Sequence, residues 1–339
     1  MSDGAISVAM ATYNGARHLR EQLDSIASQT LRPAELVIHD DGSTDQTIDL
    51  LNAFARECSF PVHIRSNEPG RSGFANAFLQ AAELSTGEFV AFCDQDDVWL
   101  PEKLATVVAA LRKSGVVLAV HACSVVDHEL RSVGRTFPRF SPGVSPPLST
   151  DPWLPVPGMA MAFERSLIDG LDWRRRPPSH DLVGEPVRHD EWVYTLARAA
   201  GSIAFLAQPL SLYRQHGTNV TGAPTQTKVS AALSTGWSYY AARRDQANGW
   251  SLAFAELAAR EQGGTRKERL RRASASYRAL AKRLAARLQV YEPRQSTWSR
   301  ARGIARLALD GGYRSRRRGG FGVRAVARDA AMVALRRVG

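Results

Sequence analysis

Cysteine is scarce in this chain of 339 residues, and long apolar runs are missing from it. The three cysteines, Cys58, Cys93 and Cys123, are too few and too scattered for a disulfide framework or a zinc site, and they suit a reducing compartment. No apolar run approaches the roughly 20 residues that cross a bilayer. The first residues show no signal-peptide pattern. We therefore expect a cytoplasmic protein, at most peripheral at the inner face of the plasma membrane.

Acidic residues are rare in the last part of the chain. From Arg266 to Gly339, 21 basic residues face four acids, so this stretch carries a net charge of +17. Because the whole chain carries +11, the first 265 residues carry −6. Such asymmetry predicts an anionic partner for the tail alone, either a membrane surface or nucleic acid.

Two glycine-rich phosphate-binding signatures are absent from the chain, which instead shows an alternation of strands and helices. The chain has neither a G-x-G-x-x-G fingerprint nor a Walker A loop, which argues against NAD-dependent enzymes and P-loop NTPases. Short apolar strands instead alternate with helical patterns, with strands expected at 6–10, 35–39, 62–65 and 89–93. This alternation predicts βαβ units in a mostly parallel sheet, with the polar segments that follow the strands gathered at one edge.

The stretch from Phe89 to Asp97 is the most informative of these. An apolar run ends in Asp94, Gln95, Asp96 and Asp97, so carboxylates collect where a buried strand ends. Ligands of open α/β sheets bind at this edge, and clustered carboxylates suit Mg²⁺ or Mn²⁺, which could hold a diphosphate. The alternative is a solvated acidic turn before the helix that begins near Pro101.

The polar segments together predict a nucleotide-diphosphate site. Tyr13 can stack on a base, Asp41 can accept a hydrogen bond from a base N–H, and Arg71 can meet a phosphate. Asp94 and Asp96 can hold ribose and metal. The alternative to substrate binding for Asp40 is that it forms the turn, and Asp45 is better explained as the cap of the next helix. The substrate-binding candidates in this half of the chain are Ala11, Tyr13, Asp40, Asp41, Arg71, Asp94 and Gln95.

Four segments carry a family resemblance: Ala11-Thr12-Tyr13-Asn14, residues 37–45, Asn67-x-x-Gly70 and residues 92–97. In this order and spacing they resemble family 2 glycosyltransferases with the GT-A fold. The resemblance implies a metal-dependent, inverting transferase that uses a nucleotide-diphosphate sugar. The Asp-Gln-Asp-Asp-x-Trp form is similar to that of bacterial members that build surface polysaccharides, several of them rhamnosyltransferases.

The resemblance also suggests the catalytic base. Inverting transfer needs a carboxylate that takes the proton of the acceptor hydroxyl. The family places it in an acid–Asp pair at the start of a helix, which Asp190 matches, although His189 replaces the acid. Glu191 is the competing candidate, and Trp192 either walls the acceptor site or belongs to the core. The alternative is that Asp190 is only an acid at the start of a helix, where the helix dipole favours negative charge.

A second family pattern, Tyr-Arg-x-His after a strand, is similar to Tyr213-Arg214-Gln215-His216. It implies that His216 joins Asp96 in the metal site and that Arg214 faces the diphosphate. Between these motifs, residues 132–155 are rich in Pro, Ser and Gly, and we expect either a mobile loop near the acceptor or a plain linker. Residues 156–163 resemble the family's strand beside the acceptor.

Beyond about Thr225 the resemblance fades and the pattern becomes helical. Apolar residues recur at spacings of three and four, with arginines and lysines on the other faces. Basic amphipathic helices favour an anionic membrane surface, whereas a bundle packed on the first domain with a solvated basic face is the alternative. We expect a GT-A domain over 1–224 and a basic helical extension over 225–339, which could also pair between chains in a homo-oligomer.

The combined prediction is an inverting transferase that moves a sugar, from dTDP-rhamnose or a UDP-sugar, to a hydroxyl of a lipid-linked or polysaccharide acceptor. A sugar nucleotidyltransferase is an alternative, but it would show a glycine-rich basic signature near its start. A non-catalytic protein that binds nucleic acid or an anionic surface is another. Its basic residues should line the crevice, yet they lie in the tail, so nucleic acid is disfavoured.

Overall fold

The first half of the chain alternates strands and helices as expected. The computed structural model describes residues 4–67, 72–182, 184–217, 236–292, 295–318 and 320–335. Its first elements are β1 Ile6–Thr12, α1 Ala16–Ala27, β2 Glu35–Asp40, α2 Thr47–Glu57, β3 Val62–Ser66, α3 Phe74–Leu84 and β4 Phe89–Cys93. Every residue of β1, β2 and β4 is buried, which suits strands covered on both faces by helices. The four predicted strands are therefore confirmed.

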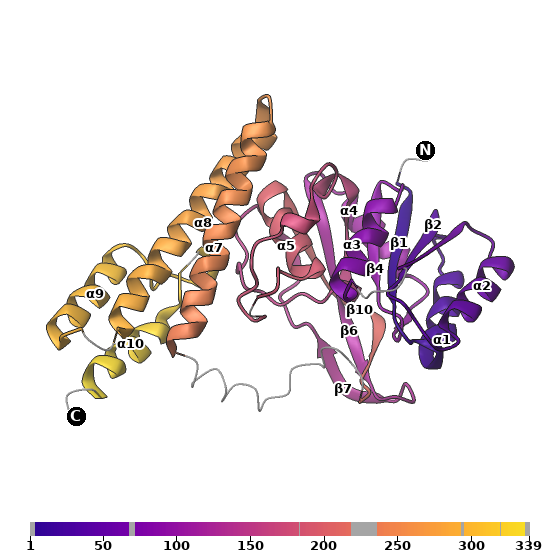
Figure 1. The fold of residues 1–339 in the computed structure, drawn as a ribbon, viewed down its shortest axis with the longest axis horizontal. Helices are drawn as coiled ribbons and strands as arrows, with labels where there is room; N and C mark the ends of the chain where they lie inside the picture. Colours follow the sequence, from indigo (N-terminus) through magenta and orange to yellow (C-terminus); the bar gives the residue numbers. More distant parts are fainter. Residues whose placement is uncertain are drawn as a thin grey trace.

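These strands and four later ones, β5 Val98–Trp99, β6 Val116–Val126, β9 Met161–Glu164 and β10 Ser202–Arg214, belong to one mixed, mostly parallel sheet. Its strand order is β3-β2-β1-β4-β9-β6-β10-β5 (Figure 1). Within the first unit β1 pairs in parallel with both β2 and β4, and Thr12 lies opposite Asp40 while Met10 lies opposite Cys93. This register brings the carboxyl ends of the three strands to one edge. The predicted GT-A-like architecture is confirmed.

The second half adds shorter and antiparallel elements. They are β5 Val98–Trp99, α4 Lys103–Leu111, β6 Val116–Val126, β7 Ser132–Phe137, β8 Gly143–Ser145, η1 Gly158–Ala160, β9 Met161–Glu164, η2 Arg165–Leu167, η3 Trp173–Arg175, α5 His189–Ala200 and β10 Ser202–Arg214. Strand β9 runs antiparallel between β4 and β6.

Three stretches differ from expectation. The segment 132–155 is neither wholly loop nor linker, because β7 pairs with β6 and β8 pairs with β10. The expected strand 156–163 is confined to β9, since a 3-10 turn occupies 158–160. Strand β10 begins at Ser202 instead of Gln208. Its register with β6 shifts around Pro209, a residue that has no N–H for a sheet hydrogen bond.

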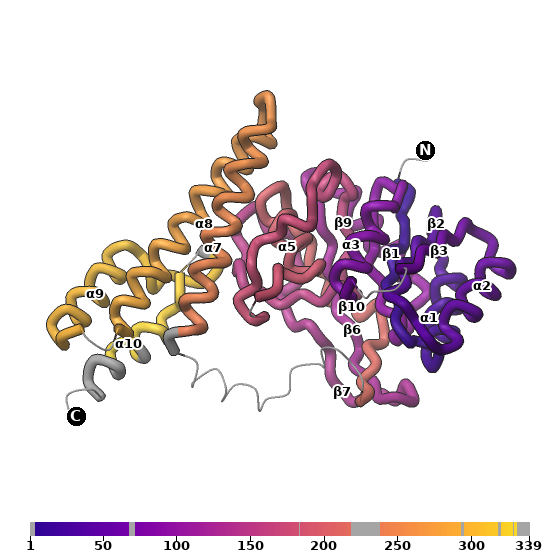
Figure 2. Tube along the Cα trace, viewed as in Figure 1, coloured from indigo at the N-terminus to yellow at the C-terminus, as the bar shows by residue number. Residues whose placement is uncertain are grey.

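The C-terminal helices are α7 Gly236–Arg260, α8 Gly264–Tyr291, α9 Thr297–Leu309, η4 Arg316–Arg318 and α10 Val323–Leu335. Helices α7 and α8 form a long antiparallel hairpin that stands beside α5 (Figures 1 and 2). The predicted boundary at 224/225 lies outside the described residues. Within those residues, no helix is both long and apolar enough to cross a membrane.

Specific polar contacts join these helices. Ser251 and Ser274 bond to each other's carbonyl oxygens across the hairpin, at 3.1 and 2.8 Å. Arg198 of α5 donates to the hydroxyl of Tyr277 on α8 at 2.7 Å. A buried ion pair joins Arg287 of α8 to Asp329 of α10 at 2.7 Å. Asp329 also accepts from the hydroxyls of Tyr291 and Tyr313, so the carboxylate is well compensated.

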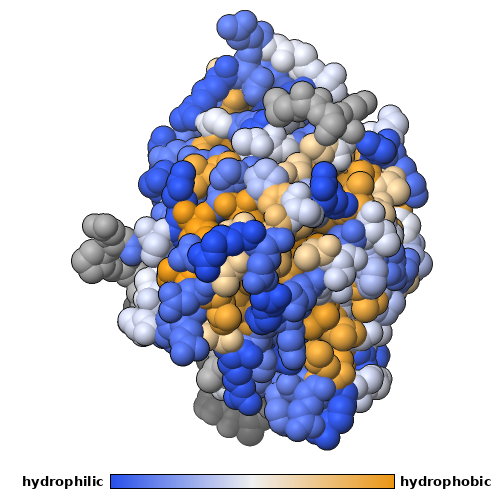
Figure 3. Space-filling view, turned by 90° about the vertical axis from the view of Figure 1, so that its right-hand side faces the viewer, coloured by the Kyte–Doolittle hydropathy of each residue, from blue (hydrophilic) through white to orange (hydrophobic). Residues whose placement is uncertain are grey.

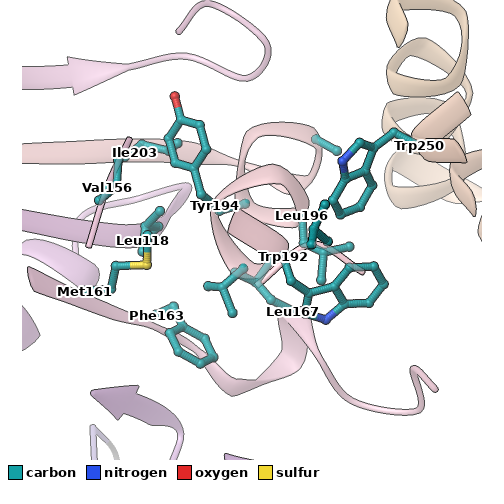
Figure 4. Packing of buried hydrophobic residues seen from close by; sticks show 14 of the residues in the cluster. Leu118, Val156, Met161, Phe163, Leu167, Trp192, Tyr194, Leu196, Ile203 and Trp250 are labelled. Atoms are coloured by element: carbon teal, nitrogen blue, oxygen red, sulfur yellow. The ribbon is translucent and has the colours of Figure 1, made fainter. Parts of the chain in front are cut away.

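Two apolar clusters occupy the two sides of the sheet. One contains buried side chains of α1, α2 and α4, and the other contains those of α3 and α5 and continues into α7 and α8. Figure 4 shows the second cluster, where Trp192 of α5 faces Trp250 of α7. The end of the molecule opposite α9 and α10 shows hydrophilic and apolar side chains interspersed (Figure 3).

Candidate active site

A pocket of about 640 Å³ opens at the carboxyl ends of β1 and β4, against the start of α5. Segments distant in sequence contribute to it, including the turn after β1, the acids after β4, η1, and the end of β10. Its described lining residues are Ala11, Thr12, Tyr13, Asn14, Gly15, Arg17, His18, Asp41, Phe74, Phe78, Asp94, Gln95, Asp96, Pro157, Gly158, Met159, Arg188, His189, Asp190, Tyr213 and His216.

Gln95 fixes the turn that follows β1. Its side-chain carbonyl accepts from the Tyr13 N–H at 2.9 Å, and its amide donates to the Tyr13 carbonyl at 3.0 Å. A side chain at Gly15 would collide with the Gln95 amide, which explains the glycine. Asn14 adopts φ 45°, and its side chain accepts from the Thr44 N–H at 2.8 Å. The main chain thus holds Tyr13 at the pocket.

Asp40 and Asp41 have different surroundings although they are adjacent. Asp40 is fully buried, and it accepts from the Gly42 and Ser43 N–H groups at 3.0 and 2.8 Å. It forms the turn and is not among the described lining residues. Asp41 lines the pocket and accepts from Ser72 N–H at 2.6 Å and Gly73 N–H at 3.0 Å. Arg71 lies outside the described residues.

The acids after β4 are close together and poorly compensated. Burial, followed by repulsion from Asp96 and Asp190, raises the pKa of Asp94 to about 7. Asp97 turns away from the pocket and accepts from the Arg214 N–H at 3.0 Å, and burial raises its pKa as well. Asp96 lies at the pocket, 2.8 Å from Nε2 of His216. The structure thus brings together the predicted pair Asp96 and His216 across 120 positions of sequence.

The donor types of this set suit a divalent cation, although the described group whose ligand atoms all lie within 4.8 Å of one another is His180, Asp181 and Glu191. Asp94 and Asp96 offer hard carboxylate oxygens, and His216 offers an imidazole nitrogen. Oxygen ligands suit Mg²⁺ and Mn²⁺, and imidazole is tolerated by Mn²⁺. The raised pKa of Asp94 has repulsion among carboxylates as one cause, and a bound cation would relieve that repulsion. Sequence reasoning missed His18, whose ring lies 5.1 Å from that of His216.

Asp190 lies in the first turn of α5 and lines the pocket. Its carboxylate accepts from the Glu191 N–H at 2.8 Å. Burial raises the pKa of Asp190 to about 6, which makes it a stronger base than an exposed aspartate. Asp94 and Asp190 line one pocket, so two carboxylates with raised pKa values lie in the same space.

His189 forms an aromatic wall next to Asp190. Its ring stacks on that of Phe78, with the ring centres 4.1 Å apart. It lies at right angles to the ring of Phe92, with the ring centres 4.9 Å apart. Burial, and then the charges of Arg176 and Arg188, lower its pKa to about 3, so it is neutral. Neither ring nitrogen has a hydrogen-bond partner among the described residues. Sequence reasoning had noticed His189 only as a departure from the family pattern.

Three other predicted residues are absent from the described lining. Glu191 points to α7, where it accepts from Gln246, and burial raises its pKa to about 7. Trp192 is buried and stacks on Trp250 at 5.2 Å, which matches the core alternative. The Arg214 guanidinium is buried, donates to the carbonyls of Asp96 and His128 and pairs with Glu21. Arg214 therefore supports the loop that carries Asp96 and is not among the described residues that line the pocket.

Lys103 is a supporting residue that the sequence reasoning did not single out. It is fully buried on α4, and its ammonium donates to the Met159 carbonyl at 2.8 Å while lying 3.6 Å from the centre of the Trp99 ring. Burial lowers its pKa to about 8. Its only sequence signal is a lysine two residues after Pro101, too common to be interpreted alone. It ties η1, a wall of the pocket, to the segment after the acids.

Comparison with known proteins agrees with this geometry. Residues 7–169, which contain β1 to β9 and the acids after β4, match the family model "Glycosyl transferase family 2". Over these residues the chain matches glycosyltransferase family 2. The family is one of inverting hexosyltransferases. This match favours the predicted transferase over a nucleotidyltransferase or a nucleic-acid-binding protein.

Individual relatives are more distant. An uncharacterized glycosyltransferase of Nostoc sp. is 32% identical over 219 residues, which span 63% of this chain and 66% of the relative, just under two thirds of its length. A dTDP-rhamnosyl transferase of Shigella flexneri is 26% identical over 237 residues, which span 65% of this chain and 76% of the relative. The crystal structure of Staphylococcus aureus TarS 1–349 with UDP-GlcNAc has a TM-score of 0.54 at 16% identity, covering 92% and 93% of the two chains, and it shows a shared fold.

Proposed function

We propose that this protein is a metal-dependent inverting glycosyltransferase that moves a sugar from a nucleotide-diphosphate donor to an acceptor hydroxyl. One observation carries the proposal: Asp190, a partly buried carboxylate with a pKa of about 6, lines the same pocket as Asp94 and Asp96. Single-displacement transfer needs this arrangement, in which a base and the carboxylates of a diphosphate-binding site face one cavity.

The donor would lie along the carboxyl ends of β1 and β4. Tyr13 offers a flat face for the base, and Asp41 and Asp94 offer acceptors for base and ribose. Asp96 and His216 would hold Mg²⁺ or Mn²⁺. When bound, such a cation would neutralise negative charge on the leaving diphosphate. Asp40, Gln95 and Arg214 would act by shaping the turns and the acid loop, since their contacts are with the protein's own backbone.

Asp190 would take the proton of the acceptor hydroxyl at its free carboxylate oxygen. The hydroxyl oxygen then forms a bond to the anomeric carbon as the bond from that carbon to the diphosphate breaks, and the electron pair leaves with the diphosphate. His189, Phe74 and Phe78 wall the pocket beside Asp190 with apolar surface. This wall excludes water, which would otherwise compete with the acceptor.

For the donor we propose dTDP-rhamnose or a UDP-sugar. The Asp-Gln-Asp-Asp-x-Trp form and the name of the Shigella relative support rhamnose. For the acceptor we propose a lipid-linked or polysaccharide glycan in surface polysaccharide synthesis, reached from an anionic membrane surface that the basic C-terminal helices contact. Residues 1–224 and 225–339 would then be a transferase domain and a docking extension.

Ligand-induced thermal stabilisation, followed by a transfer assay, tests the proposal. UDP, dTDP and GDP are each added with Mn²⁺ or with EDTA. A nucleotide at a hundredfold excess over its Kd should add about 2.7 kcal/mol, seen as a rise in Tm that EDTA abolishes. Asp96→Asn should lose the Mn²⁺-dependent part of the rise.

Asp190→Asn separates the base from donor binding. It should keep the nucleotide-induced rise in Tm yet lose about 10²–10⁴-fold in kcat with the sugar donor that the first assay identifies. Full turnover in this variant would contradict the assignment of the base. No stabilisation by any of the nucleotides would contradict the donor site.

A further inference from the structure

Helix α9 turns two large apolar side chains, Trp298 and Leu309, toward solvent. Trp298, Arg302, Ala305 and Leu309 recur at spacings of four, three and four, so they share one face of the helix. All four are exposed, Trp298 by 73% and Leu309 by 87%. A surface helix of a globular protein normally packs its apolar stripe against the core. Here the opposite face does so, through Leu307, while large apolar side chains remain outside.

Helix α10 repeats this arrangement beside α9. Val323 is 79% exposed and Val326 is 38% exposed, and Ala327 and Ala330 are exposed as well. The inner face of α10 buries Asp329, which is held by Arg287. The two helices pack against each other at the end of the molecule farthest from α2 (Figures 1 and 2). We call the exposed sides of these helices, with Trp298 and Leu309 on α9 and Val323 and Val326 on α10, the α9–α10 face.

The surroundings of the α9–α10 face are strongly basic. Its exposed arginines are Arg302, Arg306, Arg314, Arg316, Arg317 and Arg324. In the described parts of 295–330, the acids are Asp310 and Asp329, and Asp329 is buried and paired. Arg316 has Asp151 at 3.9 Å, so most of the positive charge is not offset by neighbouring acids.

We propose that the α9–α10 face binds the surface of an anionic phospholipid bilayer. Trp298, Leu309, Val323 and Val326 would enter the boundary between headgroups and acyl chains, and the arginines would lie against phosphates. Each arginine near such a surface strengthens binding about fivefold. The inference deepens the proposed function, since a lipid-linked acceptor lies at this kind of surface.

The position of helices α9 and α10 relative to the sheet bears on that role. In Figure 1, α9 and α10 lie toward the lower side of the view, as does the turn between β6 and β7 at the carboxyl end of β6. The pocket opens at the carboxyl edge of the same sheet. Helices α9 and α10 and the carboxyl end of β6 thus lie toward one side of the molecule in this view.

Two other occupants fit less well. Single-stranded nucleic acid uses aromatic platforms, whereas this face offers Trp298 among aliphatic side chains. A second copy related by a two-fold axis would bring the same patch against itself, and its arginines would then face arginines. Charge complementarity and aliphatic surface together favour anionic lipid.

Co-sedimentation with vesicles tests the inference on the full chain. One set is phosphatidylcholine, and the other is phosphatidylcholine with an equal part of phosphatidylglycerol. The protein should bind the second set strongly, in a salt-sensitive manner, and bind the first weakly. Trp298→Ser with Leu309→Ser should weaken binding at least tenfold. Arg302→Gln with Arg306→Gln should weaken it about 25-fold, the product of two arginines.

Matched controls come from the α7–α8 hairpin. Leu252→Ser removes a leucine that is 66% exposed on α7, and Arg271→Gln with Arg278→Gln removes the same charge from exposed positions of α8. Both should bind vesicles within about threefold of the parent protein, since electrostatic attraction falls off over about a Debye length.

The inference is overturned by equal binding to the two vesicle sets, or by equal losses in the control and α9 variants. It is also overturned by a concentration-dependent dimer that the Trp298→Ser, Leu309→Ser variant abolishes, or by tight DNA binding without vesicle binding. Because the assay needs neither donor nor turnover, its failure would leave the proposed transferase activity standing.

Discussion

Asp190 and Glu191 are neighbours in the chain, yet they face different parts of the molecule. Successive helical residues point about 100° apart, so one carboxylate of the first turn of α5 reaches the pocket while the next reaches α7. Glu191 accepts from Gln246 and lies 4.0 Å from His180. The sequence could nominate both acids as the base. Only the packing of α7 on α5 separates them.

Glu191→Gln should change the pH dependence of stability. Burial raises the pKa of Glu191 from 4.5 to about 7, so the folded protein holds a proton that the unfolded chain releases near pH 4.5. The contribution of Glu191 to stability is therefore full below pH 4.5 and is lost as pH rises toward 7. We expect the glutamine variant to exceed the parent protein by about 3 kcal/mol in free energy of unfolding at pH 8, with the difference falling below about 1 kcal/mol at pH 5.

Denaturant unfolding of both proteins at pH 5 and pH 8 measures this difference. Other titrating groups are common to the two proteins and cancel in the comparison. A difference independent of pH would contradict the raised pKa of Glu191. Transfer activity should survive in this variant, because Asp190 and not Glu191 faces the pocket.

At the scale of elements, the pocket wall depends on three that are far apart in sequence. Lys103 of α4 holds the Met159 carbonyl of η1, and η1 abuts His189 at the start of α5. Gly158 lies so close to Nε2 of His189 that a Cβ there would overlap the ring. His189 cannot easily yield, since Phe78 stacks on it and Phe92 meets its ring at right angles.

Gly158→Ala should therefore move His189 and, through it, Asp190. We expect a loss of about 1–3 kcal/mol in stability, typical of overpacking, and at least a tenfold loss in kcat. Nucleotide-induced stabilisation should persist, because Tyr13 and Asp41 are on other elements.

The matched control for this variant is a double-mutant cycle. Gly158→Ala should cost less stability in a His189→Ala background, where the new methyl group has room. Equal costs in the two backgrounds would show that the clash is not with His189.

At the scale of the whole molecule, the C-terminal helices share a core with the sheet. Trp250 is 1% exposed, stacks on Trp192 at 5.2 Å and on Phe254 at 5.4 Å, and belongs to the cluster that includes Phe92 and Phe163 (Figure 4). Arg198 adds a polar contact to Tyr277. An apolar interface of this kind favours unfolding of the two parts as one cooperative unit.

Trp250→Ala should lower the free energy of unfolding by about 3–5 kcal/mol, the usual cost of removing a large buried aromatic side chain. Trp298→Ala, which removes a tryptophan that is 73% exposed, should change it by less than about 0.5 kcal/mol. Helical circular dichroism and nucleotide binding should be lost together during unfolding. Loss of helix while nucleotide still binds would instead indicate that 225–339 is an independent domain.

Local pattern alone determined the order of strands and helices in the first half, because buried strands and amphipathic helices have periods visible in sequence. It also determined that acids follow β4 and that Asp190 begins a helix. It could not show which of two adjacent acids faces inward, as with Asp40 and Asp41, or Asp190 and Glu191.

The tertiary structure decided what depends on burial by residues far away in the chain. It made His189 a neutral aromatic wall, brought His216 to Asp96, and placed Lys103 beneath η1. It also decided which stripe of α9 remained outside. A sequence sets how apolar and charged side chains repeat along a helix. Which face meets water is set by the elements that pack against it.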